Sequence, residues 1–229
     1  MGIISNSRTL KTLLRLVLVS SLITLFLSNE SSAAFARNCS GLSKWNSDRS
    51  NCDFRNKNLS GADFTGFYVD GSDFSGANLT NAVFGQANNA KFMRANLTGA
   101  TFSDVYGSDF TNAKLRGANF GYVSWGKFVN ADMTDSSVDS ECTNCDMREA
   151  NLTRARVVSF DYSDLRGANL AYANFSYTEF RRTTISGSKL LWTNFSEAKF
   201  YSIQAKNLIG NKVKLPTSWK LVGGKLVRK

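Results

Sequence analysis

Candidate chemistry in this chain begins with its cysteines, because the sequence contains no histidine. Histidine supplies the usual proton shuttle near neutral pH and the commonest metal ligand. Of the four cysteines, Cys142 and Cys145 form a CxxC motif. A redox-active CxxC needs a helix start in a βαβ context, and neither is indicated around this motif. One CxxC and two distant cysteines also make a poor zinc site, since zinc needs four suitably spaced ligands.

Aspartates form the second candidate group. Five of them occupy equivalent places in a repeat described below, namely Asp53, Asp73, Asp109, Asp146 and Asp164. Carboxylate oxygens suit calcium, but lysines interrupt the series, so we expect the acids to be solvated or paired with neighbouring Lys and Arg. The sequence therefore predicts no catalytic, cofactor-binding or metal-binding residues and a protein that is not an enzyme. A deep polar pocket with converging acids would favour the alternative, an enzyme with an unfamiliar site.

Residues 1–36 are typical of a secretory signal peptide. Basic residues precede an apolar run, and the segment ends in Ala34-Phe35-Ala36, which predicts cleavage before Arg37, with cleavage after Ala33 or Ala34 as the alternatives. The alternative is an uncleaved anchor, but Leu13–Leu27 has only 15 residues, whereas a span needs roughly 20. We therefore expect no transmembrane span after cleavage and an exported protein, in a periplasm, a thylakoid lumen or the extracellular space. Export permits disulfides, and Cys39 and Cys52 are the candidate pair.

The net charge of +10 is concentrated at the ends of the chain. Residues 37–197 carry 17 basic and 17 acidic side chains, whereas residues 198–229 carry eight Lys or Arg and no Asp or Glu. A neutral body with a basic tail is not the composition of a nucleic-acid-binding domain. We therefore expect no nucleic-acid partner.

The elements that would position these residues come from a five-residue repeat between residues 52 and 210. Ala95-Asn96-Leu97-Thr98-Gly99 is one example. A large apolar residue lies at the centre, position i, with a small residue at i−2 and Asp or Asn at i−1. Neither a helical period nor strict alternation explains this pattern. A short extended side followed by a turn makes a coil, and coils that stack about 4.8 Å apart bury each other's apolar residues.

Phase slips in the repeat divide it into about eight coils with four sides each. Equivalent centres then form columns, which are the predicted core ladder: Phe74, Phe92 and Phe110 on side one, Leu79, Leu97 and Leu115 on side two, and Phe84, Phe102 and Phe120 on side three. In the middle coils only three residues, such as Ala87-Asn88-Asn89, represent side four. We expect this shortened side to keep an apolar residue at i−2 and to lack i+1 and i+2.

These units closely resemble the pentapeptide repeat family, whose consensus is A(D/N)LxX. The resemblance implies an all-β fold, a right-handed quadrilateral β-helix with i and i−2 inward, here with one side shortened in the middle coils. A three-sided section of those coils is the alternative, because 18-residue coils also occur in triangular β-helices. The family's best-understood activity is DNA mimicry toward topoisomerases, which the neutral body and the leader disfavour.

Both ends of such a coil need covering, because open edges invite association. We expect a small N-terminal cap over residues 37–51, the repeat over 52–210 and a basic C-terminal hairpin or tail over 211–229, with Gly223-Gly224 as its turn. The lysines of this tail either discourage edge pairing or form a basic patch for an anionic lipid or an acidic partner. An end cap also permits a homodimer.

Exposed aromatic side chains are typical of interaction surfaces. The candidate interaction surface lies near side four and its corners: Tyr68, Tyr106, Tyr122, Trp125, Tyr177 and Tyr201. The alternative is local packing that fills the volume of the shortened side. The sequence thus favours an exported, non-enzymatic scaffold that binds an unknown protein or the envelope surface. A self-associating structural rod is the second hypothesis.

Overall fold

The computed structural model describes Cys39 and residues 49–229. The predicted leader and most of the predicted N-terminal cap lie outside the described residues. Residues 49–229 lie in one compact unit, Ser47–Lys229, which contains every strand described below.

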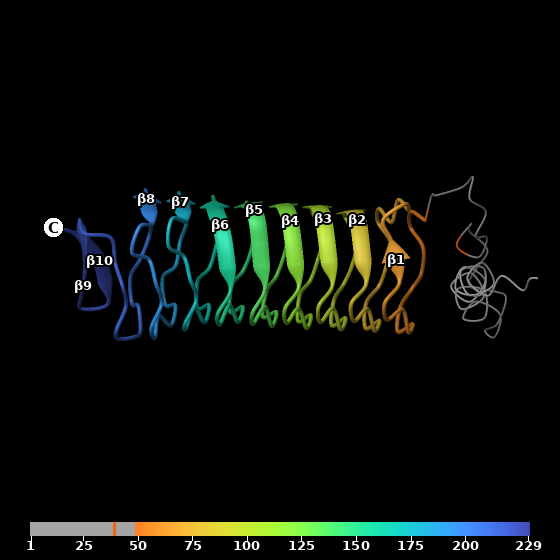
Figure 1. Ribbon diagram of the computed structural model, residues 1–229, viewed down its shortest axis with the longest axis horizontal. Helices are drawn as coiled ribbons and strands as arrows, with labels where there is room; N and C mark the ends of the chain where they lie inside the picture. The colour runs from red at the N-terminus through yellow and green to blue at the C-terminus, as the bar shows by residue number, and fades with distance from the viewer. Residues whose placement is uncertain (1–38, 40–48) are drawn as a thin grey trace, which may run out of the picture. The chain divides into compact units, whose positions relative to one another are not determined.

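Eight strands form one parallel sheet in chain order, so the fold is a β-solenoid of successive coils (Figure 1). They are β1 (Asp63–Phe64), β2 (Val83–Asn88), β3 (Thr101–Tyr106), β4 (Asn119–Ser124), β5 (Ser137–Thr143), β6 (Arg156–Asp161), β7 (Glu179–Arg181) and β8 (Lys199–Tyr201). Isolated parallel bridges such as Asn96 with Lys114 stack the remaining sides. This confirms the predicted all-β solenoid of about eight coils.

The corners between sides are β-turns that follow directly from the repeat. The Ala77 N–H donates to the Phe74 carbonyl at 3.0 Å, and Gly76 between them has a φ of 71°. A turn with positive φ at its third residue favours glycine or asparagine. Asn81 and Asn112 take the same conformation at other corners, which explains why the repeat ends in Gly or Asn.

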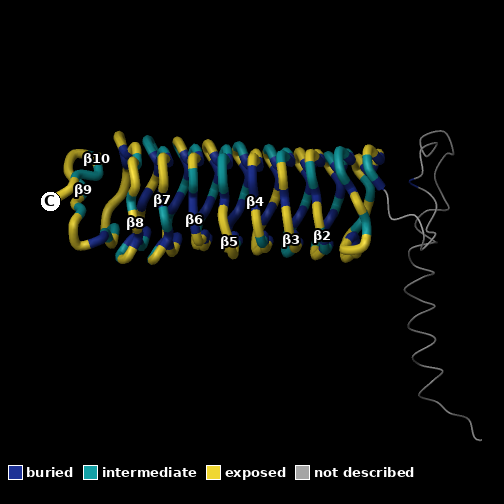
Figure 2. Tube along the Cα trace, turned by 90° about the horizontal axis from the view of Figure 1, so that it is seen from above, coloured by how far each residue is buried: buried dark blue, intermediate teal, exposed yellow. Residues whose placement is uncertain are grey.

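Inside the coils, the centres stack in columns. The nine side chains of the predicted core ladder are at most 1% exposed, and buried and exposed residues alternate along each coil (Figure 2). The Phe84 and Phe102 rings stack with centroids 4.7 Å apart, while Phe92 meets Phe102 edge to face at 5.5 Å. Columns on sides one and three therefore interlock across the interior.

The shortened side lacks different residues from those expected. Strand pairing aligns Ala87 with Val105, and the same column continues to Phe160 and Phe180, the centre of a full-length fourth side. Ala87 is therefore a centre rather than an i−2 residue, and Asn88 and Asn89 follow it as i+1 and i+2. The expectation that these two positions are missing is wrong.

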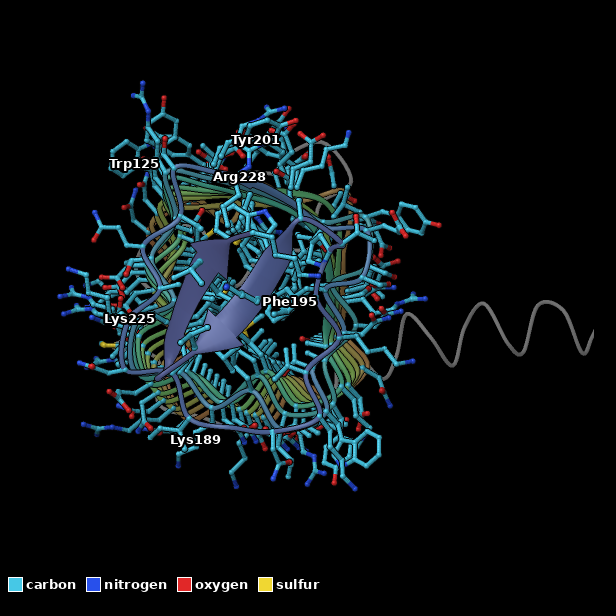
Figure 3. All side chains as sticks on the ribbon, turned by 90° about the vertical axis from the view of Figure 1, so that its left-hand side faces the viewer. Trp125, Lys189, Phe195, Tyr201, Lys225 and Arg228 are labelled. Carbon is cyan, nitrogen blue, oxygen red and sulfur yellow. A yellow bond between two sulfur atoms is a disulfide. The ribbon has the colours of Figure 1, made fainter. Side chains whose placement is uncertain are left out.

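What the middle coils lack is the turn between sides three and four. β3 runs through this point without a break, with Phe102 and Val105 both buried. The residue type could not distinguish the two assignments, because i and i−2 both face inward. Along the coil axis the outline of this unit stays roughly four-sided (Figure 3).

A two-stranded antiparallel hairpin, β9 (Trp219–Val222) and β10 (Lys225–Arg228), covers the C-terminal end of the coil (Figure 3). Gly223 and Gly224 form its turn with φ of 53° and 72°, as the sequence predicted. The Trp219 ring meets Phe200 edge to face at 5.2 Å. The hairpin therefore extends the aromatic interior and covers the C-terminal end of the coil, where the Leu208 N–H donates to the Gly224 carbonyl at 2.9 Å.

Candidate interaction surface

The aspartates of side one are engaged in outward hydrogen bonds rather than gathered in a cleft. Asp53 accepts from the Arg55 guanidinium, with 2.6 Å between the charged atoms, and this hydrogen bond lowers the pKa of Asp53 to about 2. Arg148 lowers the pKa of Asp146 in the same way. Within the described residues, no group of three or more acidic or cysteine side chains is placed to hold a metal ion.

The CxxC cysteines are bonded to each other and buried. Cys142 and Cys145 form a disulfide across the inside of the corner between sides four and one, and both are at most 1% exposed. The Ser163 hydroxyl of the next coil donates to the Cys142 carbonyl at 2.8 Å and accepts from the Cys145 N–H at 3.1 Å. An external thiol cannot reach these sulfurs without local opening, so the bridge is structural.

The candidate pair near the N-terminus is also oxidised. Cys39 and Cys52 are each disulfide-bonded, and no cysteine is free among the described residues. Their pairing with each other stays a prediction.

Three of the six candidate aromatic residues lie together on neighbouring coils. Tyr106 ends β3, Tyr122 lies on β4, and Trp125 occupies the corner directly after β4. Tyr106 is aligned with Ser124, two residues beyond Tyr122. The three side chains are exposed by 52%, 38% and 57% respectively. We call these three residues the side-four aromatic patch.

The other three candidates do not join this patch. Tyr201 shares the column of Tyr106 through successive pairings, but five coil steps place it about 24 Å away. Tyr177 lies at a corner of the same distant coils, and Tyr68 lies before β2. The structure thus spreads the predicted surface along the solenoid and concentrates only its middle part.

Local packing, the alternative explanation for the exposed aromatic residues, accounts for Tyr201 better than for the side-four aromatic patch. The Arg181 guanidinium lies over the Tyr201 ring, 5.3 Å from its centroid. Within residues 49–229, Tyr106, Tyr122 and Trp125 take part in no ring pair or cation–π contact. Their rings therefore lie on the surface without an aromatic or cationic partner in this part of the chain.

A second group of exposed apolar side chains escaped the sequence analysis. It lies on side two of the last coils and comprises Tyr172, Leu191, Trp192 and Ile209. Its signal was present in the sequence, because Leu191 and Trp192 stand where Thr98 and Gly99 stand in a consensus unit. We call these four residues, together with Lys189 and Lys212, the side-two terminal patch.

Five-residue sides around inward columns of Phe and Leu define the class of this protein, a β-solenoid repeat protein. The family model for pentapeptide repeats matches eight copies, over residues 58–88, 70–135 and 163–200. The chain belongs to the pentapeptide repeat family. No curated protein matches it in sequence.

The chain is also similar to several solved structures. The chain is similar to HetL, a pentapeptide repeat protein involved in heterocyst differentiation regulation from the cyanobacterium Nostoc sp. strain PCC 7120, with 18% identity over 77% of this chain and 92% of that chain and a TM-score of 0.46. It is also similar to QnrB1, a plasmid-mediated fluoroquinolone resistance protein, with 19% identity over 67% of this chain and 82% of that chain and a TM-score of 0.38. A third similar structure is a pentapeptide repeat protein from the Arabidopsis thaliana thylakoid lumen, with 27% identity over 52% of this chain and 69% of that chain and a TM-score of 0.19.

In the part of the chain that the structure describes, no helix has the length and apolar character needed to cross a membrane.

Proposed function

We propose that this protein is an exported, non-enzymatic scaffold that binds another protein through the side-four aromatic patch. The observation that carries the proposal is the exposure of Tyr106, Tyr122 and Trp125 on adjacent coils. Tyrosine and tryptophan are enriched at the centres of protein interfaces, where they contribute a large share of the binding free energy. The loss of the turn between sides three and four gives these rings a continuous strand surface.

Charges around the side-four aromatic patch indicate the kind of partner. Asp104 is aligned with Tyr122, and Asp139 and Glu141 lie on the neighbouring strand β5. All three acids are exposed, and none forms an ion pair within the described residues. Complementary charge at the rim of an interface speeds association and selects partners. The partner therefore carries a basic rim around an apolar centre.

The cysteines and the leader support export. Every cysteine of the chain is disulfide-bonded, as expected in an oxidising compartment. A periplasm, a thylakoid lumen or the extracellular space would each supply such conditions. Subcellular fractionation with mass spectrometry of the N-terminus tests this part alone, and we expect a chain that begins at Arg37. A full-length chain in the cytoplasm would refute it.

Capture with a matched control tests the binding surface. We expect the triple variant Tyr106→Ala, Tyr122→Ala, Trp125→Asn to lose at least about 30-fold in affinity for a protein that the wild type captures, because a hot-spot side chain contributes about 2 kcal/mol or more. Trp125 has a φ of 57°, which asparagine tolerates. The control Tyr177→Asn removes a still more exposed tyrosine at a distant corner, where φ is also positive. Calorimetry with the purified partner gives both affinities, and equal affinities for the triple variant and the wild type would refute the proposal.

A self-associating rod is the second candidate, and the hairpin bears on it. Because β9 and β10 cover the C-terminal end, two molecules could associate only through the other end of the coil or through contacts between their caps. Light scattering across a range of concentrations separates the two functions, since a binder stays monomeric and a rod grows.

A further inference from the structure

Side two carries a polar ladder in two stretches, one before and one after Lys114. The Asn96 amide donates to the Thr80 hydroxyl of the preceding coil at 3.0 Å, and the same contact recurs farther along the chain. Its last instance is Asn169, whose amide donates to Asn151 and Thr153 at 3.1 Å each. This ladder satisfies the outward polar groups of the repeat.

Beyond Asn169 the outward residues of side two change character. Lys189 is bridged to both Asn169 and Ile209, so the side-two terminal patch continues the same column without a break. The Tyr172 N–H donates to the Leu191 carbonyl at 2.8 Å. These residues therefore lie on consecutive coils of a single wall.

Folding does not explain these residues. Tyr172, Leu191, Trp192 and Ile209 point outward, with exposures between 37% and 62%. Tyr172 and Trp192 also have positive φ, 59° and 57°, where side chains other than Asn carry a conformational cost. Glycine and asparagine occupy the same corner in the early coils. Asp135 and Arg154 take the same conformation at this corner in the middle coils, so the last coils differ in that their outward side chains are apolar and exposed.

Positive charge lies at this wall and over the C-terminal end of the chain beyond it. Lys212 lies over the Trp192 ring, 4.4 Å from its centroid, and Lys189 is exposed. Residues 198–229 hold eight Lys or Arg and no acid. Only Lys199 among these eight forms an ion pair within the described residues, with Glu179.

We propose that the side-two terminal patch docks on the surface of a bilayer rich in anionic lipid. Trp192 and Tyr172 suit the headgroup level, Leu191 and Ile209 reach the acyl boundary, and the lysines pair with anionic headgroups. The cations are spread over the whole C-terminal end. This distribution suits the diffuse charge of a lipid surface better than the discrete acceptors of a protein. The docking is independent of the side-four aromatic patch.

Vesicle flotation tests the proposal with the protein as isolated from an exporting host. The vesicles are phosphatidylcholine alone or mixed with phosphatidylglycerol. The test variant Lys189→Asn, Leu191→Thr, Trp192→Asn restores the repeat consensus and so preserves folding. Lys114→Asn is the matched control, because it removes the same charge from the same column four coils earlier.

The wild type and Lys114→Asn are expected to float with the anionic vesicles, and added salt should weaken both. Loss of one lysine near an anionic surface lowers the partition coefficient onto the vesicles about fivefold. The test variant also loses Trp192 and Leu191, so its partition coefficient should fall at least about tenfold. Three results would overturn the proposal: no flotation of the wild type, equal flotation of the test variant, or equal binding to phosphatidylcholine alone. Capture of a soluble protein that needs Trp192, without vesicle binding, would instead assign the patch to a protein partner.

Discussion

Replacing Phe102 by alanine tests whether the aromatic columns hold the coils together. Phe102 is 1% exposed at the centre of side three. Its ring stacks on Phe84 and Phe120, with centroids 4.7 and 5.0 Å away, and meets Phe92 and Phe110 edge to face at 5.5 and 5.4 Å. Each of these four partners belongs to the same interlocked interior.

Two substitutions separate the cavity from the ring contacts. Truncation of a core phenylalanine to alanine costs about 3–5 kcal/mol. We expect the upper half of that range for Phe102→Ala, because backbone hydrogen bonds hold the coils about 4.8 Å apart and oppose collapse. Phe102→Leu keeps most of the volume but loses the two stacked and the two edge-to-face pairs, each worth about 0.5–1.5 kcal/mol, and we expect it to cost less than Phe102→Ala.

Urea unfolding gives the two free energies, and thermal unfolding offers a second measure. In a unit of this size 1 kcal/mol shifts Tm by about 2–4 °C, so Phe102→Ala should lower Tm by about 8–20 °C. Phe200→Ala is the control. Phe200 is half-buried beneath the hairpin and supports one coil interface rather than two, so its loss should cost less.

Hydrogen exchange locates the damage. Coils of a solenoid contact only their neighbours, so Phe102→Ala should reduce amide protection in β2, β3 and β4 and leave β7 and β8 nearly unchanged. A loss below about 1 kcal/mol, or an equal loss of protection in every coil, would refute the account of stacked columns.

Three further predictions concern a close contact between coils, a corner and a surface ion pair. Gly85→Ala should lower the free energy of unfolding in urea by about 1–3 kcal/mol, because the new Cβ would lie 2.8 Å from a backbone carbonyl oxygen of the preceding coil. The control Gly66→Ala places its Cβ in open space and should be neutral or slightly stabilising. Equal losses for the two variants would contradict this prediction. Arg94→Asn should stabilise by about 0.5–1 kcal/mol, because Arg94 has a φ of 59° that asparagine adopts more readily; a loss in unfolding free energy would argue against it. Because Arg55 lowers the pKa of Asp53 to about 2, the pair stabilises the fold above the ordinary carboxyl pKa of about 4, and this contribution disappears as the pH falls toward 2. Carboxyl NMR titration should show the pKa of Asp53 rising in Arg55→Ala with little change in stability, since both side chains are exposed; an unchanged pKa would exclude the ion pair.

Much of the fold could be predicted from the sequence because each five-residue unit meets the same demands. The centre must be apolar, the residue two before it must be small, and the corner must accept positive φ. Leu97 and Leu115 fall in one column for this reason. The turn of the hairpin was equally readable, because Gly223 and Gly224 stand between alternating apolar residues.

The shortened side could not be read in the same way. Ala87 is small and apolar, so it satisfies both the i−2 and the i position. Only its alignment with Val105, and of Phe160 with Phe180 farther along, identifies it as a centre. The disulfide between Cys142 and Cys145 could not be predicted from the CxxC motif either, because the motif alone does not show whether the corner brings the two sulfurs together.

Candidate sites were predictable in type but not in grouping. Aromatic residues at outward positions indicated an interaction surface, yet the distance between Tyr106 and Tyr201 depends on how many coils separate them. The side-two terminal patch was missed because, in the sequence, Leu191 and Trp192 are only departures from the repeat consensus. The sequence does not show that they are neighbours of Ile209 on the next coil.

The sequence by itself determined that the chain coils, which residues face inward, and that positive charge collects at its C-terminal end. These properties are local, because each depends on residue size, charge and turn preference within one unit. Tertiary structure decided which outward residues become neighbours, since stacking brings together side chains 18–20 positions apart in the chain. The side-four aromatic patch and the side-two terminal patch exist only through that stacking, because neither is contiguous in any single repeat.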